Sequence, residues 1–386
     1  MAYRHVSLIA GLAVWLAVVP ASGRTWTNRL GRTFDAEFVR VDGANVIFSL
    51  PNGRKFSSPL ADLSAGDQAS LQAGGQVRSL EMSAANFGRP WPREVRLDRP
   101  VVCKTVSEDA KAGRYIYESP GYRFTCDARV TDDALRNLSV MFEATLKYAK
   151  SVPLGLAGRE RNGKLDILLF GTMREYCRAG GPPNSAGCFA RGVVLVPMES
   201  LGLKEGNTGF SLDGKNDNKV LIHELIHQLT PNVYMQPGSR GWFSEGLAES
   251  MSITPYNWGY FSPDIHGNIV KAYVTASGVD GRGGRGLGTH IKAPKLKEFF
   301  LMPYRAFAME NGQFNYGVGL LLTEYFLHME GGGKAFRITK FLQGLHAGQQ
   351  GEAALAPLLG GGSYEKLEGE ISAAWARIGV QIDFGG

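Results

Sequence analysis

The amino-acid sequence predicts a mixed α+β protein in which a small β-rich module precedes a larger unit built from a sheet and helices. The chain has 386 residues, which is too long for one small core. Its N-terminal part contains short stretches of alternating apolar and polar residues, the pattern of half-buried strands. Later stretches have the 3.6-residue apolar periodicity of helices, and one of them carries closely spaced histidine and glutamate residues.

The N-terminus has the pattern of a secretory signal peptide. Arg4 precedes an apolar run of 14 residues from Val6 to Val19, and small residues then allow cleavage after Gly23. The run is shorter than the roughly 20 residues of a comfortable membrane span, and no later stretch reaches that length. We therefore expect residues 1–23 to be removed and the mature chain to be secreted or periplasmic, without a transmembrane anchor.

Residues 24–78 are predicted to form a small antiparallel barrel. Alternating runs at 36–41 and 46–50 are separated by Asp42-Gly43, and Asn52-Gly53 follows the second run. Asp-Gly and Asn-Gly pairs favour the tight turns that connect antiparallel strands.

Several residues of this module also match a known pattern. They are Arg24-Thr25-Trp26, Gly31, Phe34, Ala36-Glu37-Phe38, Asn52-Gly53, Pro59-Leu60, Leu63 and Asp67. The segment resembles the Sla homology module, an SH3-like domain often attached near the N-terminus of exported bacterial proteins. The resemblance implies that the module binds a protein or peptide ligand. The alternative is a spacer, or an inhibitor-like cover on the unit that follows.

A stretch rich in Pro and Arg, residues 79–100, is predicted to be an extended linker to the larger unit, residues 101–386. That unit is expected to contain a sheet packed against a motif-bearing helix, followed by a mostly helical lobe. The elements expected before the motif are strands at 101–105 and 115–125, a helix beginning at Thr131, a strand at 164–170 and an edge strand at 187–196.

The most informative motif is His223-Glu224-Leu225-Ile226-His227. Surrounding apolar residues and Pro231 predict a buried helix that ends before the proline, with residues 216–218 available to cap its start. On such a helix, His223 and His227 lie one turn apart on one face, where both imidazoles can bind one metal ion. Glu224 lies one step round the helix, beside the position left open on the metal.

Two histidines leave a catalytic zinc ion one protein ligand short. The metzincin pattern HExxHxxGxxH is excluded, because Thr230 occupies its glycine position and Val233 its third histidine position. With three protein ligands, a water in the fourth position has a pKa near 7, and Glu224 is predicted to take its proton as general base. The alternative is a core helix whose histidines are satisfied without metal.

A second segment supplies a candidate third ligand. Residues 242–249 read W-x-x-E-G-x-A-E, and 17 residues separate Glu245 from His227. The segment resembles that of the gluzincin metallopeptidases, the superfamily of thermolysin-like enzymes and aminopeptidase N. The resemblance implies that Glu245 is the third ligand of one Zn²⁺ ion, although the gap is one residue shorter than is usual in the aminopeptidase N branch.

Glu249 lies one helical turn beyond Glu245. Its carboxylate is predicted to accept the free N–H of a metal-binding imidazole. The alternatives are a solvated surface carboxylate and an exchange of roles in which Glu249 replaces Glu245 as ligand.

Hydrolysis also needs a donor for the oxyanion that develops on the substrate. Tyr316-Gly317-Val318-Gly319 resembles the Y-x-x-G segment of the aminopeptidase N branch, where that tyrosine stabilises the transition state. A tyrosine packed at a helix start is the alternative, and His290 is the second candidate donor. The G-x-M-E-N signature of that branch is missing upstream of the motif, so exopeptidase activity is unsupported. An edge strand could still hold an extended peptide by main-chain hydrogen bonds.

Four cysteines fit an exported protein. The simplest of three pairings joins Cys103 to Cys126 and Cys177 to Cys188, since each pair is local in the sequence. Free buried thiols are the alternative.

Together these features predict an exported zinc metallopeptidase that acts on a peptide or protein substrate. The net charge of +6 is modest for this length, and Gly281–Gly286 lacks the strand-turn-helix frame of a nucleotide site. We expect that segment to be a mobile loop and expect no nucleic-acid partner. Two alternatives stay open: an exported binding protein with a structural or vestigial zinc site, and a zinc hydrolase of a small non-peptide substrate.

Overall fold

A computed structural model describes most of the chain beyond residue 23. The described residues are 24–28, 31–42, 45–50, 54–59, 62–64, 66–68, 71, 85–158, 160, 163–183, 185–190, 192–213, 219–264, 267–276 and 284–385. The predicted signal peptide, the predicted capping residues 216–218 and residues 281–283 of the glycine-rich segment lie outside them. The chain divides into two compact units, Met1–Leu80 and Glu81–Gly386, and each is described by itself.

The first unit contains a four-stranded antiparallel sheet in which each strand pairs with the next along the chain. Its core gathers aromatic side chains, among which the rings of Trp26 and Phe48 lie 4.9 Å apart. The Trp26 indole N–H donates to the Ala36 carbonyl. The strands are β1 (Arg24–Thr27), β2 (Thr33–Asp42), β3 (Asn45–Ser49) and β4 (Lys55–Pro59).

The predicted barrel is not closed. Within the described part of this unit, β1 and β4 form the two edges of an open sheet. Among the described residues, the four-residue β1 forms a ladder only with β2. Directly after β1, Asn28 forms a single isolated bridge to Leu63. The predicted turn glycines Gly43 and Gly53 lie outside the described residues.

The second unit is built on a six-stranded mixed sheet with the order β10-β11-β9-β8-β7-β6. The pairs β11/β9 and β9/β8 are parallel and the others antiparallel. The predicted edge strand at 187–196 is a hairpin, of which only the first strand lies at the edge. The strands are β6 (Lys104–Asp109), β7 (Arg114–Glu118), β8 (Tyr122–Cys126), β9 (Leu165–Phe170), β10 (Cys188–Ala190) and β11 (Val193–Pro197).

Much of the predicted linker belongs to this second unit. The Asn86 amide donates to the Pro153 carbonyl, and β5 (Val95–Arg96) pairs with β15 (Tyr260–Phe261). The Arg89 guanidinium donates to the Lys150 carbonyl. Residues 85–100 are therefore anchored to the unit that they were expected only to precede.

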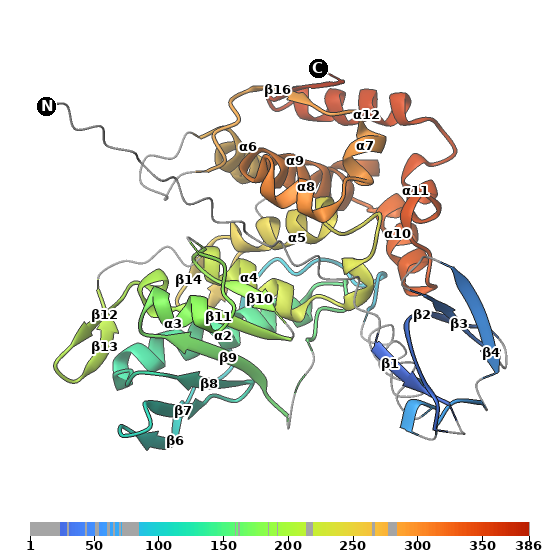
Figure 1. The fold of residues 1–386 in the computed structure, drawn as a ribbon. Helices are drawn as coiled ribbons and strands as arrows, with labels where there is room; N and C mark the ends of the chain where they lie inside the picture. Colours follow the sequence, from blue (N-terminus) through green and yellow to red (C-terminus); the bar gives the residue numbers. More distant parts are fainter. Residues whose placement is uncertain are drawn as a thin grey trace, which may run out of the picture. The chain divides into compact units, whose positions relative to one another are not determined.

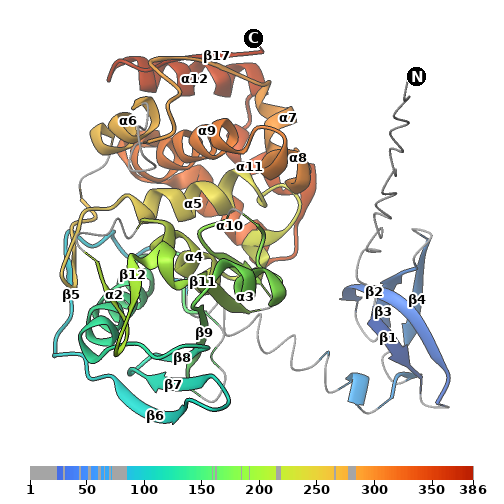
Figure 2. The same cartoon turned by 60° about the vertical axis from the view of Figure 1, so that its left-hand side comes forward.

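Three helices connect the sheet to the helical lobe (Figures 1 and 2). Helix α2 (Asp132–Ser151) contacts β8, and α4 (Lys219–Leu229) contacts β10, β11 and α2. Helix α5 (Trp242–Ser252) packs on α4 from the other side and on α9 (Gly312–Glu324) of the lobe. Helix α4, which carries the histidine motif, thus lies between the sheet and α5.

The rest of the second unit is mainly helical, as expected, and Trp375 lies on the last helix. The remaining helices are α3 (Met173–Arg178), α6 (Asn268–Thr275), α7 (Leu296–Phe300), α8 (Tyr304–Met309), α10 (Phe336–His346), α11 (Gly351–Leu359) and α12 (Tyr364–Ala376). Short helical turns are η2 (Met198–Leu201), η3 (Asn232–Met235), η4 (Tyr325–Met329) and η5 (Glu330–Gly332). Short strands are β12 (Leu203–Gly206), β13 (Gly209–Leu212), β14 (Tyr256–Asn257), β16 (His290–Ala293) and β17 (Gln381–Phe384).

The two predicted disulfides are not formed in the structure. All four cysteines are free thiols, and Cys126 is buried in the core. The Cys188 thiol lies beside the Tyr176 hydroxyl, and burial raises its pKa. Cys177 lies on α3 and Cys188 on β10, and proximity in the sequence alone does not bring the two thiols into bonding geometry.

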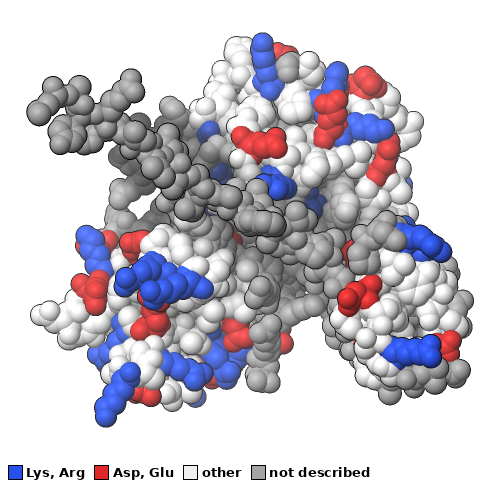
Figure 3. Space-filling model, viewed as in Figure 1, with Lys and Arg blue, Asp and Glu red and all other residues white. Residues whose placement is uncertain are grey.

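The described surface has no single dominant charge on the face shown in Figure 3, where basic and acidic side chains are interspersed. This distribution agrees with the modest net charge of +6. Within the described part of the chain, the helices lack the combination of length and apolar character that a membrane span requires.

Helices α5 and α9 approach closely at two glycines. A Cβ atom on Gly246 would lie 2.3 Å from both the Gly319 carbonyl oxygen and the Thr323 hydroxyl. A Cβ atom on Gly319 would lie 2.9 Å from the Trp242 carbonyl oxygen. The glycine that follows Glu245 therefore lets the helix bearing that glutamate pack directly on α9.

We predict that Gly246→Ala destabilises the protein by about 1–3 kcal/mol, because the added methyl group meets backbone that cannot move aside without separating the helices. Gly369→Ala is the matched control, since Gly369 lies exposed in α12 with no atom near its would-be Cβ, and alanine is the better helix former. Thermal unfolding measures both. Equal melting temperatures for the two variants would contradict the close approach.

Candidate metal centre

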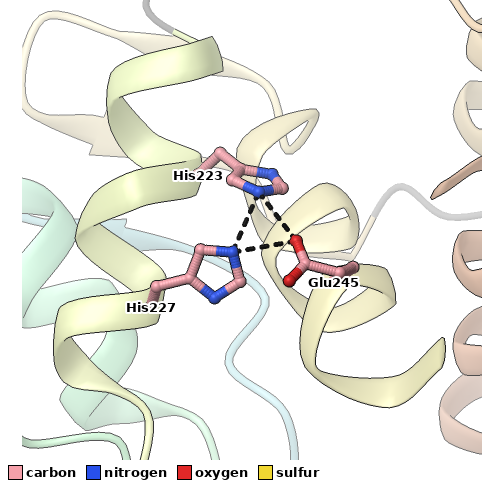
Figure 4. A group of neighbouring side chains, drawn as sticks. All are labelled: His223, His227 and Glu245. Atoms are coloured by element: carbon pink, nitrogen blue, oxygen red, sulfur yellow. Dashed lines mark hydrogen bonds and ion pairs between the residues drawn. The ribbon is translucent and has the colours of Figure 1, made fainter. Parts of the chain in front are cut away.

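Helices α4 and α5 bring His223, His227 and Glu245 together (Figure 4). The two histidines lie one turn apart on α4, and their Nε2 atoms are 3.0 Å from each other. Glu245 reaches them from α5, with its Oε2 atom 3.0 Å from His227 Nε2 and 3.3 Å from His223 Nε2. Three potential ligand atoms therefore converge on one point.

The spacing of these atoms fits a zinc ion. Zinc bonds of about 2.0 Å at tetrahedral angles place neighbouring ligand atoms about 3.3 Å apart. The observed separations of 3.0 to 3.3 Å are close to that value. Two imidazole nitrogens and one carboxylate oxygen are also the donor set that suits zinc in catalytic sites.

The electrostatics of the cluster favour a cation between these side chains. Burial opposes protonation of His223, but Glu245 and Glu249 outweigh it and raise its pKa to about 10. Burial alone would raise the pKa of Glu245, yet His227 and His223 hold it well below its usual range. The raised pKa favours a protonated His223, and a metal ion bound at Nε2 would take the place of that proton.

Glu249 contacts the opposite side of the His223 ring. Its Oε1 atom lies 3.0 Å from His223 Nδ1, as expected for an acceptor that fixes the orientation of the imidazole. The side chain is only 2 % exposed, so it is not a solvated surface carboxylate. Glu249 faces Nδ1, whereas the cluster is formed by the Nε2 atoms, so Glu245 rather than Glu249 supplies the carboxylate oxygen that meets both imidazoles.

Two residues around the cluster were not anticipated from the sequence. Arg285 donates from Nε to Glu249 Oε2 at 2.8 Å, and its Nη2 also contacts the Glu249 carboxylate. The Tyr304 hydroxyl donates to Glu245 Oε1 at 3.1 Å. Arg285 belongs to the stretch Gly281–Gly286, which the sequence predicts to be a mobile loop, and Tyr304 is in no recognisable motif. Neither residue carried a local sequence signal of its role.

A pocket of about 520 Å³ opens beside the cluster. Glu224 is half-buried and lines it together with His223. On the other side, the backbone at Gly187 lies so close that a Cβ atom there would be 3.4 Å from Glu224 Cγ. The end of the segment leading into edge strand β10 therefore faces the predicted general base.

Tyr316 lines the same pocket from α9. The centroid of the Tyr316 ring lies 6.0 Å from that of the His223 ring. The Arg285 guanidinium lies over the Tyr316 ring, 5.0 Å from its centroid. Burial, with the nearby Glu245 carboxylate, raises the pKa of Tyr316 above its ordinary value, so the phenol keeps its proton.

His290 does not join this arrangement. It begins β16, is exposed and pairs in register with Gln381 of β17. It is not among the described residues that line the pocket. The structure therefore does not bring His290, the second candidate donor, to the pocket. Its position is set by the pairing of β16 with β17.

Comparisons with protein-family models, with curated proteins and with solved structures find no match for this chain.

Proposed function

We propose that the chain is an exported zinc-dependent metallopeptidase that hydrolyses peptide bonds with Glu224 as general base. The observation that carries this proposal is the convergence of His223, His227 and Glu245 beside a pocket that Glu224 lines. The resemblance of the two motif segments to gluzincin peptidases points to the same chemistry.

His223, His227 and Glu245 would hold the ion. When bound, zinc would act as a Lewis acid and lower the pKa of a water molecule to about 7. Glu224 directly follows His223 in the chain and lines the pocket. Its carboxylate can therefore take the proton from a water beside the cluster. The same carboxyl can return the proton to the leaving amine.

Tyr316 is the best-placed donor for the oxyanion. It lines the same pocket as Glu224, and its phenol keeps its proton in this buried setting. A preorganised O–H donor stabilises negative charge that develops on a carbonyl oxygen, especially where water is excluded. His290 lacks this position because it lies exposed on β16.

The edge strand supports a peptide as the substrate. Among the described residues, β10 pairs only with β11, which leaves its other side without a ladder partner. An extended peptide can add to such an edge by main-chain hydrogen bonds, with its scissile bond near Gly187 and Glu224. This arrangement favours a peptide over a small ester or amide, and it needs no free substrate amine.

A structural zinc site is the less favoured alternative. Such sites are usually closed by four protein ligands, whereas only three described side chains converge here. A purely structural site also does not require a carboxylate such as Glu224 beside an open pocket.

We predict that Glu224→Gln lowers peptide hydrolysis by at least about 100-fold, because the amide cannot accept the proton of water, while one zinc ion per chain is still bound. His223→Ala should lose both activity and metal. Digestion of a mixed peptide library, read by mass spectrometry, and metal analysis of the same samples measure both effects. Turnover by Glu224→Gln at the wild-type rate would overturn the role of Glu224.

We predict that zinc stabilises the folded protein, because the three ligands converge only in the native state. A free zinc concentration 100 times the dissociation constant should add about 2.7 kcal/mol and raise the melting temperature by several degrees. The His223→Ala/His227→Ala double variant serves as control. A zinc-dependent shift of equal size in that variant would place the binding site elsewhere.

We predict that Glu249→Gln weakens zinc binding by about 10- to 100-fold, because the amide holds the His223 ring less firmly than the carboxylate does. Glu310→Gln, at an exposed position beyond the end of α8, is the matched control and should bind zinc like the wild type. Competition with a chromogenic chelator measures the affinities. Identical affinities for the two variants would argue against the Glu249 contact.

A further inference from the structure

We propose that Tyr304 is a positioning residue that fixes Glu245 so that only one carboxylate oxygen faces the metal position. The inference rests on the proposed zinc site and concerns a residue that the sequence motifs do not include. It is carried by the division of contacts between the two oxygens of Glu245.

Each oxygen of Glu245 has its own partners. Oε2 lies 3.0 Å from His227 Nε2 and 3.3 Å from His223 Nε2, so it belongs to the ligand cluster. Oε1 accepts the Tyr304 hydroxyl at 3.1 Å. The side chain is 2 % exposed, so water has little access to replace either partner. Turning Oε1 toward the imidazoles would therefore break a hydrogen bond in a buried setting, which is costly.

Tyr304 is itself held in place. It is the first residue of α8 and follows Pro303, whose φ of −58° and ψ of 137° set the start of that helix. The Arg240 guanidinium lies over its ring at 4.3 Å. Arg240 directly precedes Gly241, the residue at the N-cap of α5, so the contact ties the start of α8 to the start of the helix that carries Glu245.

Tyr304 and Tyr316 have different surroundings although they are neighbours. Among the described residues, Tyr316 lines the pocket and Tyr304 does not. The Tyr304 hydroxyl donates to Glu245 Oε1 and also lies beside the Tyr316 hydroxyl. Tyr304 is therefore assigned to ligand orientation and Tyr316 to the substrate side. Partners that orient metal ligands in this way typically change metal affinity by about 10- to 100-fold when they are removed.

The test is a zinc titration of the full-length, metal-free chain, in which Tyr304→Phe removes one oxygen and keeps the ring. We expect the zinc dissociation constant of Tyr304→Phe to rise about 10- to 100-fold. Tyr256→Phe is the matched control, and zinc affinity should not change in it. The Tyr256 hydroxyl accepts from the Gly259 amide, and Tyr256 is not among the described residues that form the cluster or line the pocket.

A second comparison separates positioning from a general effect on the fold. In a Glu245→Ala background, adding Tyr304→Phe should cause no further loss of zinc affinity, because the carboxylate through which Tyr304 acts is gone. A further loss in that background overturns the proposal. So does an unfolded metal-free Tyr304→Phe protein, because Tyr304 would then support the fold rather than the ligand.

The outcomes also distinguish this inference from the proposed function. Wild-type protein that binds no zinc refutes the proposed metal site itself. Wild-type protein that binds one zinc ion, with an unchanged affinity in Tyr304→Phe, leaves the proposed function standing and overturns only the role of Tyr304.

Discussion

The packing of α5 against α4 is the constraint on which the rest of the site depends. It places a glutamate carboxylate within 3.0 to 3.3 Å of two imidazole nitrogens in a space that is almost closed to solvent. Buried charges of this kind need partners, and the proposed zinc ion would be a partner common to all three side chains. On the other partner of α5, Gly246 lets α9 pack closely against the residue next to Glu245.

Around this core, each polar side chain has a defined contact. Glu249 meets the far nitrogen of His223 and is in turn contacted by Arg285, while Tyr304 meets the oxygen of Glu245 that does not face the histidines. The buried polar groups are thus connected rather than isolated, which is the condition under which such a network can be rigid. Rigidity matters for hydrolysis because oxyanion donors work best when they need not reorganise.

The sequence was most informative where the relevant contacts are local. His223 and His227 are one helical turn apart, so their convergence could be predicted from spacing alone, and Glu249 followed from the same periodicity. The contacts of Tyr304 and Arg285 join residues far apart in the chain, and no spacing rule reaches them. The α+β class was predicted, whereas the closed barrel, the two disulfides and the place of His290 were wrong, because strand pairing and cysteine partners are set by tertiary packing.

The central claim is that one zinc ion is held by two nitrogens and one oxygen supplied by α4 and α5. The most direct measurement is a crystal structure of the zinc-loaded protein with anomalous diffraction recorded at the zinc absorption edge. The account predicts one strong anomalous peak at bonding distance, about 2.0–2.2 Å, from Nε2 of His223, Nε2 of His227 and Oε2 of Glu245. A peak at any other place, or no peak while these side chains keep their positions, would contradict it.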